Sequence, residues 1–385
     1  MKIQSIKQLK NLKNQRVLLR VDYNVVIEKG KIKEDYRLQA SLKTIKWLLA
    51  KGTSLIIISH LGQPRGESKE LSLRPVAKHL QKLLGRPVKF IPEVLGNQVK
   101  TAVAKLKPGE IILLENLRFR PEETSNDQGF AEKLARLADV YVNDALAVSH
   151  RAHASVAAIK KYLPVYAGLL LTEELQALDK VVKPRLPLVV IMGGAKIETK
   201  APLIAKLFKS ANQILIGGAL ANNFFAEQGW EVGQSLIDQT GQTVLQQFYS
   251  QNKLKSKIIL PIDVVVKNRL GRVRLCRPDQ LTKSEMILDI GPQTISLFAK
   301  YISQAQTLIW NGPMGKFEEA PFKQGTLSIA RSVAARSKGR AYGVVGGGET
   351  IAALNLTKMA EYVDWVSTAG GALLAYLGGE EMPGL

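Results

Sequence analysis

Residues 307–318 read Thr-Leu-Ile-Trp-Asn-Gly-Pro-Met-Gly-Lys-Phe-Glu, an apolar run followed by a loop rich in glycine and proline. The run Leu308–Trp310 predicts a strand, so the loop lies at the carboxyl end of that strand, where open α/β sheets bind ligands. Gly312 and Gly315 allow the backbone of this loop to approach a ligand closely. Glu318 adds a carboxylate that could hold a ribose hydroxyl or a metal ion. The stretch therefore predicts a ligand site at the edge of a parallel sheet.

Short apolar runs recur along the chain, and stretches with helical periodicity lie between them. The predicted strands are Val17–Val21, Leu55–Ser59, Ile111–Glu115, Val140–Asn143, Leu188–Met192, Ile214–Gly217, Ile258–Leu260, Met286–Ile290, Leu308–Trp310 and Tyr342–Val345. The predicted helices include Leu38–Ala50, Pro75–Leu84, Ala201–Lys209 and Thr294–Ala305. Continuous apolar strands that alternate with helices are typical of parallel sheets covered on both faces. The pattern therefore indicates an α/β fold.

The series of strands and helices occurs twice, which predicts two doubly wound, Rossmann-like domains with parallel sheets. Pro184 and Pro187 follow a helix predicted over Leu170–Val181, and we expect this helix to connect the domains. The expected boundaries are residues 1–168 for the first domain, 169–183 for a hinge helix and 184–366 for the second domain.

The composition separates several classes of protein. The chain has 385 residues and a formal net charge of +21, but its lysines and arginines are spread along its whole length and only 6% of its residues are aromatic. The positive charge alone would suggest nucleic-acid binding, but we do not expect this function, because there are too few aromatic residues to form rows of stacking platforms. No apolar run reaches 18 residues, and the lysine-rich N-terminus does not resemble a secretory signal. The single cysteine, Cys276, fits a reducing cytoplasm and is expected to be an inert strand residue.

Polar residues follow the predicted strands of the first half. They occur in the stretches Arg20–Asn24, Ser59–Gly62, Glu115–Phe119 and Asn143–His153. Any one of these stretches is also typical of capping or of a turn. Together with Arg37, Arg118 and Arg151 they predict a converging basic cluster. Guanidinium groups that form paired hydrogen bonds suit a small substrate bearing phosphate and carboxylate groups.

Glycine-rich turns follow the strands of the second half. Gly193 and Gly194 precede two lysines, Lys196 and Lys200, that are four residues apart and so share one helix face. A strand, paired glycines and a helix start together make an anion site. The turn at residues 346–350 adds a carboxylate and a hydroxyl suited to magnesium and phosphate, and residues 367–372 form a third such turn. The sequence motifs of P-loop enzymes and of protein kinases are absent.

These motifs, taken in order, resemble those of the phosphoglycerate kinase family. They are R-V-D-x-N from residue 20, S-H-L-G from 59, E-N-L-R-F from 115, N-D-A…H-R-A-H from 143, G-G-A-K-x-x-x-K from 193, W-N-G-P-M-G-x-F-E from 310, G-G-G-E from 346 and S-T-A-G-G-A from 367, together with L-P-x-D at 260 and D-I-G-P at 289. The resemblance runs from residue 16 to residue 385. It implies reversible phosphoryl transfer from 1,3-bisphosphoglycerate to MgADP, which gives 3-phosphoglycerate and MgATP, the substrate pair of glycolysis and gluconeogenesis.

The resemblance also implies roles for individual residues. Those for the glycerate substrate are Asp22, Tyr23, Asn24, Arg37, His60, Leu61, Gly62, Gln63, Arg118, Arg151 and His153. Those for the nucleotide are Gly193, Gly194, Lys196, Lys200, Gly217, Gly218, Asn311, Pro313, Glu318, Gly347, Gly348, Glu349 and Thr350, with Mg²⁺ at Glu349. Catalysis would fall to Arg37, Lys196, Lys200, Gly370 and Gly371, without a general base, because the acceptor carboxylate is already ionised at neutral pH. We also expect a monomer that closes about the hinge helix, with residues 367–385 returning to the first domain.

The chain departs from the family pattern at several positions. Gln63 stands where the family has an arginine, with Arg65 two residues further on, and Glu349 stands where the family has an aspartate. Further departures are Ala147, Val148, Ala219, Ile287 and Ala369. A catalytically silent, nucleotide-binding homologue therefore remains the second reading, and a divergent but active enzyme is the first.

Overall fold

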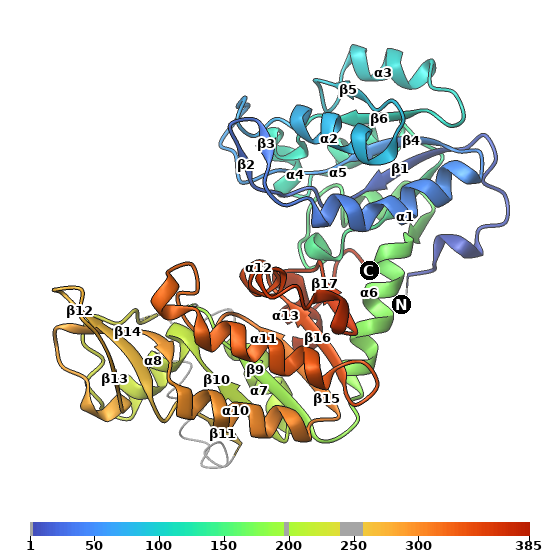
Figure 1. Ribbon diagram of the computed structural model, residues 1–385. Coiled ribbons are helices and arrows are strands. Elements are labelled where there is room, and N and C mark those ends of the chain that lie inside the picture. The colour runs from blue at the N-terminus through green and yellow to red at the C-terminus, as the bar shows by residue number, and fades with distance from the viewer. Residues whose placement is uncertain (1–2, 196–199, 239–256) are drawn as a thin grey trace. The chain divides into compact units, whose positions relative to one another are not determined.

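The computed structural model describes residues 3–195, 200–238 and 257–385 (Figure 1). The chain divides into two compact units, one formed by residues 1–176 with 381–385 and the other by residues 177–380. The boundary falls within helix α6 (Leu169–Val182). Residues 367–380 belong to the second unit, so the segment that joins the first unit is shorter than the expected 367–385.

The first unit is built on a six-stranded parallel sheet with the order β5-β6-β4-β1-β7-β8. Its strands are β1 (Arg16–Arg20), β4 (Ser54–Ile58), β5 (Lys89–Ile91), β6 (Ile111–Leu114), β7 (Val140–Asn143) and β8 (Val165–Ala167). Its helices are α1 (Tyr36–Ala50), α2 (Arg74–Leu84), α3 (Asn97–Ala104), α4 (Pro121–Thr124) and α5 (Gln128–Ala135). A small hairpin of β2 (Ile27–Glu28) and β3 (Lys31–Ile32) completes the unit.

Alternate residues of these strands enter two separate cores, which is why the strands are apolar without interruption. Val17 and Leu19 of β1 pack with α1 and α2, through residues such as Leu38, Ile45 and Leu80. Leu18, between them, packs with Val99 of α3 and with Phe130 and Leu134 of α5. Helices therefore cover both faces of the sheet, and the carboxyl ends of the strands are free to carry polar residues.

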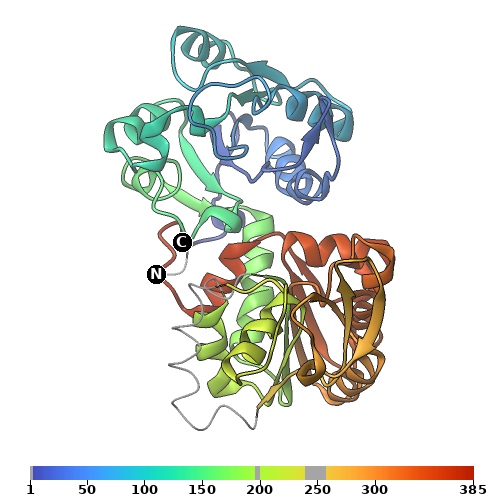
Figure 2. The same cartoon turned by 90° about the vertical axis from the view of Figure 1, so that its left-hand side faces the viewer.

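The second unit repeats this plan with the order β11-β10-β9-β15-β16-β17, again entirely parallel. Its strands are β9 (Leu188–Met192), β10 (Gln213–Ile216), β11 (Ile258–Ile259), β15 (Thr307–Asn311), β16 (Tyr342–Gly346) and β17 (Trp365–Ser367). Its helices are α7 (Ala201–Ser210), α8 (Gly218–Glu227), α10 (Pro292–Gln304), α11 (Gln324–Arg336), α12 (Gly348–Leu356) and α13 (Gly371–Gly378). Figure 2 shows helix layers on both faces of this sheet. The predicted α/β fold with two doubly wound, parallel-sheet domains is confirmed.

One predicted strand belongs elsewhere. Met286–Ile290 corresponds to β14 (Glu285–Ile290), which lies in a separate antiparallel sheet with β12 (Val264–Asn268) and β13 (Val273–Cys276). Antiparallel pairing leaves one face of the sheet open to solvent, and Met286 and Leu275 are accordingly exposed. Cys276 is a buried strand residue without a disulfide, as expected.

Residues 381–385 are part of the first unit, which forms hydrogen bonds with the backbone of Gly384. The Asn143 Nδ2 donates to the carbonyl oxygen of Gly384 at 3.0 Å, and the Gly384 N–H donates to the carbonyl oxygen of Ser149 at 2.9 Å. A Cβ at Gly384 would lie 2.8 Å from the Cα of Ser149, so only glycine allows this approach. The segment therefore fixes the loop that follows β7.

Candidate active site

The carboxyl ends of β1, β6 and β7 and the start of α1 bring together the arginine cluster, which consists of Arg20, Arg37, Arg118 and Arg151. His60, which follows β4, is 3% exposed and lies close enough to the cluster for its pKa to be affected. Its pKa is lowered well below the usual value, first by burial and then by the charges of all four arginines. An uncharged imidazole therefore lies among four guanidinium groups, and this part of the first unit favours an anionic ligand.

Arg37 is held at this edge by two acceptors. Its Nη1 lies 2.6 Å from Asp22 Oδ2 and donates to the carbonyl oxygen of Asn24 at 2.9 Å. The Asp22 Oδ1 accepts in turn from the backbone N–H of Asn24 at 3.1 Å. The three predicted residues are therefore in mutual contact, and the guanidinium group stays about one quarter exposed.

Arg118 has two guanidinium nitrogens without a hydrogen-bond acceptor among the described residues. Its Nη1 donates to the carbonyl oxygen of Gly62 at 2.6 Å, whereas its Nε and Nη2 are buried and have no hydrogen-bond partner among the described residues. Burial, together with the charges of Arg151 and Arg20, lowers the pKa of Arg118 to about 10. Unpaired buried donors are costly, and a bound phosphate or carboxylate would satisfy both.

Neighbouring side chains fix the loop after β4. The Asn24 Oδ1 accepts from the Gly62 N–H at 2.8 Å, and the amide of Asn116 bonds both the N–H and the carbonyl oxygen of Leu61 at 3.1 and 2.7 Å. Gln63 and Arg65, which follow in the same loop, are both exposed. The loop is therefore rigid as far as Gly62, and the two long polar side chains lie beyond it.

Other predicted substrate residues occupy different surroundings. The side chain of Tyr23 is fully buried, with its hydroxyl 2.9 Å from Ser41 Oγ, and Leu61 is buried as well. The Nδ1 of His153 is buried without a hydrogen-bond partner in the described part of the chain, at 3.9 Å from Glu123 Oε1. Burial and the charges of Arg118 and Arg151 lower the pKa of His153 to about 4. The Arg151 Nε donates to His150 Nε2 at 3.3 Å.

The buried support of this cluster was predicted only in part, since Arg20 belongs to a polar stretch named from the sequence whereas Glu123 and Ser155 do not. Arg20 is fully buried, donates from Nε to Ser155 Oγ at 3.1 Å, and places Nη2 3.3 Å from His60 Nδ1. Glu123, also fully buried, accepts from the hydroxyl and the backbone N–H of Ser155 at 2.6 and 2.9 Å. The available signal was a charged residue, Arg20, at the end of an otherwise apolar strand.

In the second unit, turns after three strands interlock at the backbone. The Gly193 N–H donates to the Asn311 carbonyl at 3.0 Å, the Gly194 N–H to the Pro313 carbonyl at 2.8 Å and the Gly218 N–H to the Met314 carbonyl at 3.0 Å. A Cβ at Gly193 would lie 2.0 Å from the Pro313 oxygen. The glycines are therefore required by close packing of the loops. Gly217 precedes α8 as its N-cap.

Lys200 and Glu349 flank the Gly194 turn. The Lys200 Nζ donates to the carbonyl oxygen of Gly193, and a Cβ at Gly194 would lie 2.8 Å from that Nζ and 3.9 Å from Glu349 Oε2. Lys200 is only 7% exposed, and burial lowers its pKa to about 8, although the charge of Glu349 opposes the shift. The predicted Lys196 lies outside the described residues.

The turn after β16 is tied to the loop quoted first. The Asn311 Nδ2 donates to the Gly346 carbonyl at 2.8 Å, and Thr350 Oγ1 accepts from the Gly312 N–H at 2.7 Å. Helix α12 begins directly after Gly347, which has a φ of +99°. Gly370 and Gly371 stand at the corresponding start of α13. Free N–H groups at helix starts attract anions.

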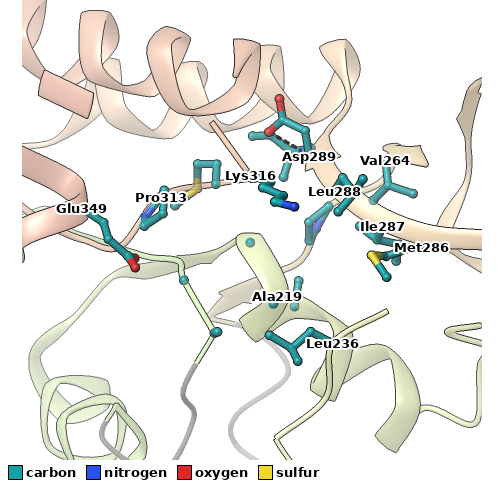
Figure 3. A pocket seen from close by; sticks show the side chains of 18 of the residues that line it. Ala219, Leu236, Val264, Met286, Ile287, Leu288, Asp289, Pro313, Lys316 and Glu349 are labelled. Atoms are coloured by element: carbon teal, nitrogen blue, oxygen red, sulfur yellow. Dashed lines mark hydrogen bonds between the residues drawn. The ribbon is translucent and has the colours of Figure 1, made fainter. Parts of the chain in front are cut away.

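A cavity of about 400 Å³ opens among these turns (Figure 3). Predicted nucleotide residues that line it are Gly194, Gly218, Pro313, Glu318 and Glu349. Figure 3 shows Glu349 at one end and Met286, Ile287 and Leu236 at the other. The cavity is therefore polar at one end and apolar at the other, as an adenine nucleotide requires. In the sequence, Ala219 and Ile287 stood out only as departures from the family pattern, and the rest of the apolar wall was missed because apolar side chains carry no chemical signal.

The aspartates of two matched motifs are structural. The Asp289 carboxylate accepts from the N–H groups of Ile290 and Gly325 at 2.9 and 2.8 Å, and burial raises its pKa to about 7. Asp263 accepts from the N–H groups of Gln293 and Thr294, in the first turn of α10, at 2.9 and 2.7 Å. These carboxylates hold the walls of the cavity.

Glu349 is the carboxylate nearest to the Gly194 turn that could hold a metal ion together with nucleotide phosphates. Within residues 3–195, 200–238 and 257–385 there is no group of three or more histidine, cysteine or acidic residues arranged to bind a metal alone. A hard cation that keeps phosphate ligands needs one or two carboxylates, so the site fits Mg²⁺ carried by a nucleotide. Among the described helices, none has the length and apolar character needed to cross a membrane.

Comparisons with known proteins agree over nearly the whole chain. Residues 6–380 match the family model described as phosphoglycerate kinase. The phosphoglycerate kinase of Moorella thermoacetica is 43% identical over 380 residues, which cover 97% of this chain and 96% of the relative. That of Bartonella bacilliformis is 43% identical over 392 residues, covering 100% and 98%.

Solved structures are similar over the same span. The structure of phosphoglycerate kinase from Coxiella burnetii has a TM-score of 0.84 at 38% identity and covers 100% of this chain and 98% of its own. The enzyme from Pyrococcus horikoshii has a TM-score of 0.85 at 29% identity, covering 99% and 97%.

Proposed function

Because the chain belongs to the phosphoglycerate kinase family and is a phosphotransferase with a carboxyl group as acceptor, we propose which of its residues perform each part of the reaction. The first unit binds the phosphoglycerate and the second unit binds the nucleotide. Nucleic-acid binding is not favoured as the function, since the relatives and solved structures described above are phosphoglycerate kinases.

The glycerate substrate is bound by the arginine cluster. The two unpaired donors of Arg118 are the observation that carries this assignment, because they need an anion with two acceptor oxygens. Arg151 supplies further positive charge, and Asp22 and Asn24 bind the hydroxyl and carboxylate region. His60, whose pKa is depressed, contributes a neutral imidazole to this site.

The nucleotide occupies the cavity of the second unit. Its base lies against Met286, Ile287 and Leu236, and its phosphates lie near Gly194, Lys200 and the start of α12. Glu318 binds the ribose. Glu349 holds Mg²⁺, which supplies charge neutralisation to the nucleotide phosphates.

Transfer depends on positioning and on neutralised charge, with no general base. The acceptor carboxylate is ionised at neutral pH, so no proton has to be removed from it. Arg37 from the first unit, with Lys200 and the start of α13 from the second, stabilises the charge on the moving phosphoryl oxygens. Since acceptor and donor bind to different units, turnover includes a motion about α6, which contains the boundary between the units. We further propose a monomer that works in the cytoplasm.

A coupled assay with the purified protein tests the proposal. ATP should form from MgADP and 1,3-bisphosphoglycerate, and the reverse reaction should run from 3-phosphoglycerate and MgATP. A folded protein that binds nucleotide but turns over in neither direction would identify a silent homologue. Affinity for nucleic acid that falls steeply with salt concentration and does not change with ADP would support nucleic-acid binding as the function instead.

A further inference from the structure

A second cavity, of about 570 Å³, lies in the first unit, and none of its lining residues belongs to the arginine cluster. It lies among α3, α4 and α5. Leu95, Phe130 and Leu137 give it an apolar floor, and Phe130 and Leu137 are buried. A volume of this size suits a small molecule with a ring system.

The rim of this cavity carries two free ammonium groups. Lys100 on α3 and Lys133 on α5 line the cavity, are exposed, and make no hydrogen bond or ion pair with any residue that the structure describes. The rim carboxylates are already engaged. Glu122 Oε1 accepts from Arg120 at 3.0 Å, and Asp127 Oδ1 accepts from the Phe130 N–H at 2.6 Å. Arg120 and Arg136 also line the cavity, so its four cationic side chains outnumber its two carboxylates above an apolar floor.

We propose that this cavity binds a phosphate monoester with an apolar ring. The phosphate lies between Lys100 and Lys133, and the ring packs on Phe130 and Leu137. This site is independent of the proposed catalytic roles.

The test uses 1-naphthyl phosphate and isothermal titration calorimetry on the full chain. Saturating 3-phosphoglycerate is present, so that the arginine cluster is occupied. Inorganic phosphate supplies the charge alone and 1-naphthol the ring alone. We expect 1-naphthyl phosphate to bind at least about tenfold more tightly than either, since both parts of the cavity contribute about 1.4 kcal/mol or more.

Two double variants locate the binding. Lys100→Gln with Lys133→Gln should weaken binding of 1-naphthyl phosphate about tenfold or more. Lys105→Gln with Lys107→Gln removes the same charge from exposed positions that do not line the cavity, and should leave binding unchanged. Turnover of 3-phosphoglycerate in both variants serves as the control for folding.

Three results would overturn the proposal. They are equal binding in the two double variants, binding no tighter than that of inorganic phosphate, and loss of binding in Arg118→Ala but not in the Lys100 and Lys133 variant. The last result would assign the probe to the arginine cluster. None of them bears on phosphoryl transfer, which the coupled assay measures separately.

Discussion

The Nη1 of Arg37 lies 2.6 Å from Oδ2 of Asp22, a carboxylate whose side chain is only 7% exposed. A guanidinium group held by a nearly buried carboxylate is oriented before any substrate arrives. Pre-oriented charge is the main contribution a protein can make to phosphoryl transfer, because the reaction needs little covalent chemistry from side chains.

Replacing Arg37 by alanine should therefore lower kcat by on the order of 10³–10⁵, as the loss of a cation at a moving phosphoryl group does in related transfers. The KM for MgADP should hardly change, because Arg37 belongs to the other unit. Steady-state kinetics measures both. Arg86→Ala, an exposed arginine of the same unit, is the matched control. Retention of more than about a tenth of kcat, a loss below ~1.4 kcal/mol, would rule out this role.

Lys200 should give the enzyme an alkaline limit. Its pKa is about 8 because it is buried, and only the charged form can neutralise a phosphoryl group. The kcat/KM for MgADP, which reports the free enzyme, should therefore fall above about pH 8. In Lys200→Arg the side chain stays charged, so this limb should be absent whatever the residual activity. The same limb in that variant would assign the titration to another group.

The pKa of Lys200 also predicts a trend in stability. Its usual value is 10.5, so between about pH 8 and pH 10.5 the unfolded chain binds more protons at this residue than the folded one. The free energy of unfolding should therefore rise with pH through this window. Denaturant titrations at several pH values should show a smaller rise in Lys200→Met than in the parent protein.

Glu349→Ala should abolish most turnover at low magnesium, because the cation loses its carboxylate ligand. Glu349→Asp keeps the charge and should stay active. Initial rates over a magnesium titration distinguish the two variants. Glu361→Ala, which removes an exposed carboxylate of the same unit that does not line the cavity, controls for the loss of negative charge alone. An alanine variant at Glu349 with the parent's magnesium dependence would remove this residue from the site.

Gln63 and Arg65 are both exposed beyond the rigid part of the loop, so either position could supply a contact to the substrate. Substitutions at the two positions distinguish these cases. We expect Arg65 to replace the missing guanidinium, so that Arg65→Ala raises the KM for 3-phosphoglycerate about tenfold and Gln63→Arg changes little. If instead Gln63→Arg lowers this KM and Arg65→Ala leaves it unchanged, Arg65 does not replace the family's arginine. Two silent variants would show that the loop does not touch the substrate.

Gly193→Ala should destabilise the second unit by about 1–3 kcal/mol or more, because its Cβ would meet the Pro313 carbonyl oxygen at 2.0 Å. Gly348→Ala is the control, since a Cβ there meets no atom within 4 Å among the described residues. Thermal unfolding followed by circular dichroism compares them. Equal midpoints for the two variants would mean that the interlocked turns can move apart.

The sequence predicted the parallel sheets because their strands are buried on both faces. Val140–Asn143 and Leu188–Met192 are found with the predicted bounds, since each is an unbroken run of buried residues. Edge strands such as Lys89–Ile91 and Trp365–Ser367 were missed because they are three residues long and partly exposed. The strand Val273–Cys276 exposes three of its four residues, and only its buried residue, Cys276, was expected to belong to a strand.

The candidate site divides in the same way. Residues that follow a strand, such as Asp22, His60 and Arg118, could be identified because polar groups interrupt the apolar pattern there. Arg20 could be identified only as a charged strand end and Glu123 not at all, because their roles depend on buried contacts with Ser155, more than 30 residues distant from either in the sequence. Leu236 and Met286 line the nucleotide cavity only because the antiparallel sheet and the loop after α8 meet there.

The contact between Asn143 and Gly384 has a consequence for synthesis on the ribosome. All six strands of the first sheet are translated before the second unit begins, so this sheet can assemble early. Residues 381–385 are translated only after the whole second unit, and until then the loop after β7 lacks the backbone partner that fixes it. In the growing chain, the loop next to Arg151, which belongs to the arginine cluster, is therefore the last part of the first unit to be fixed in place.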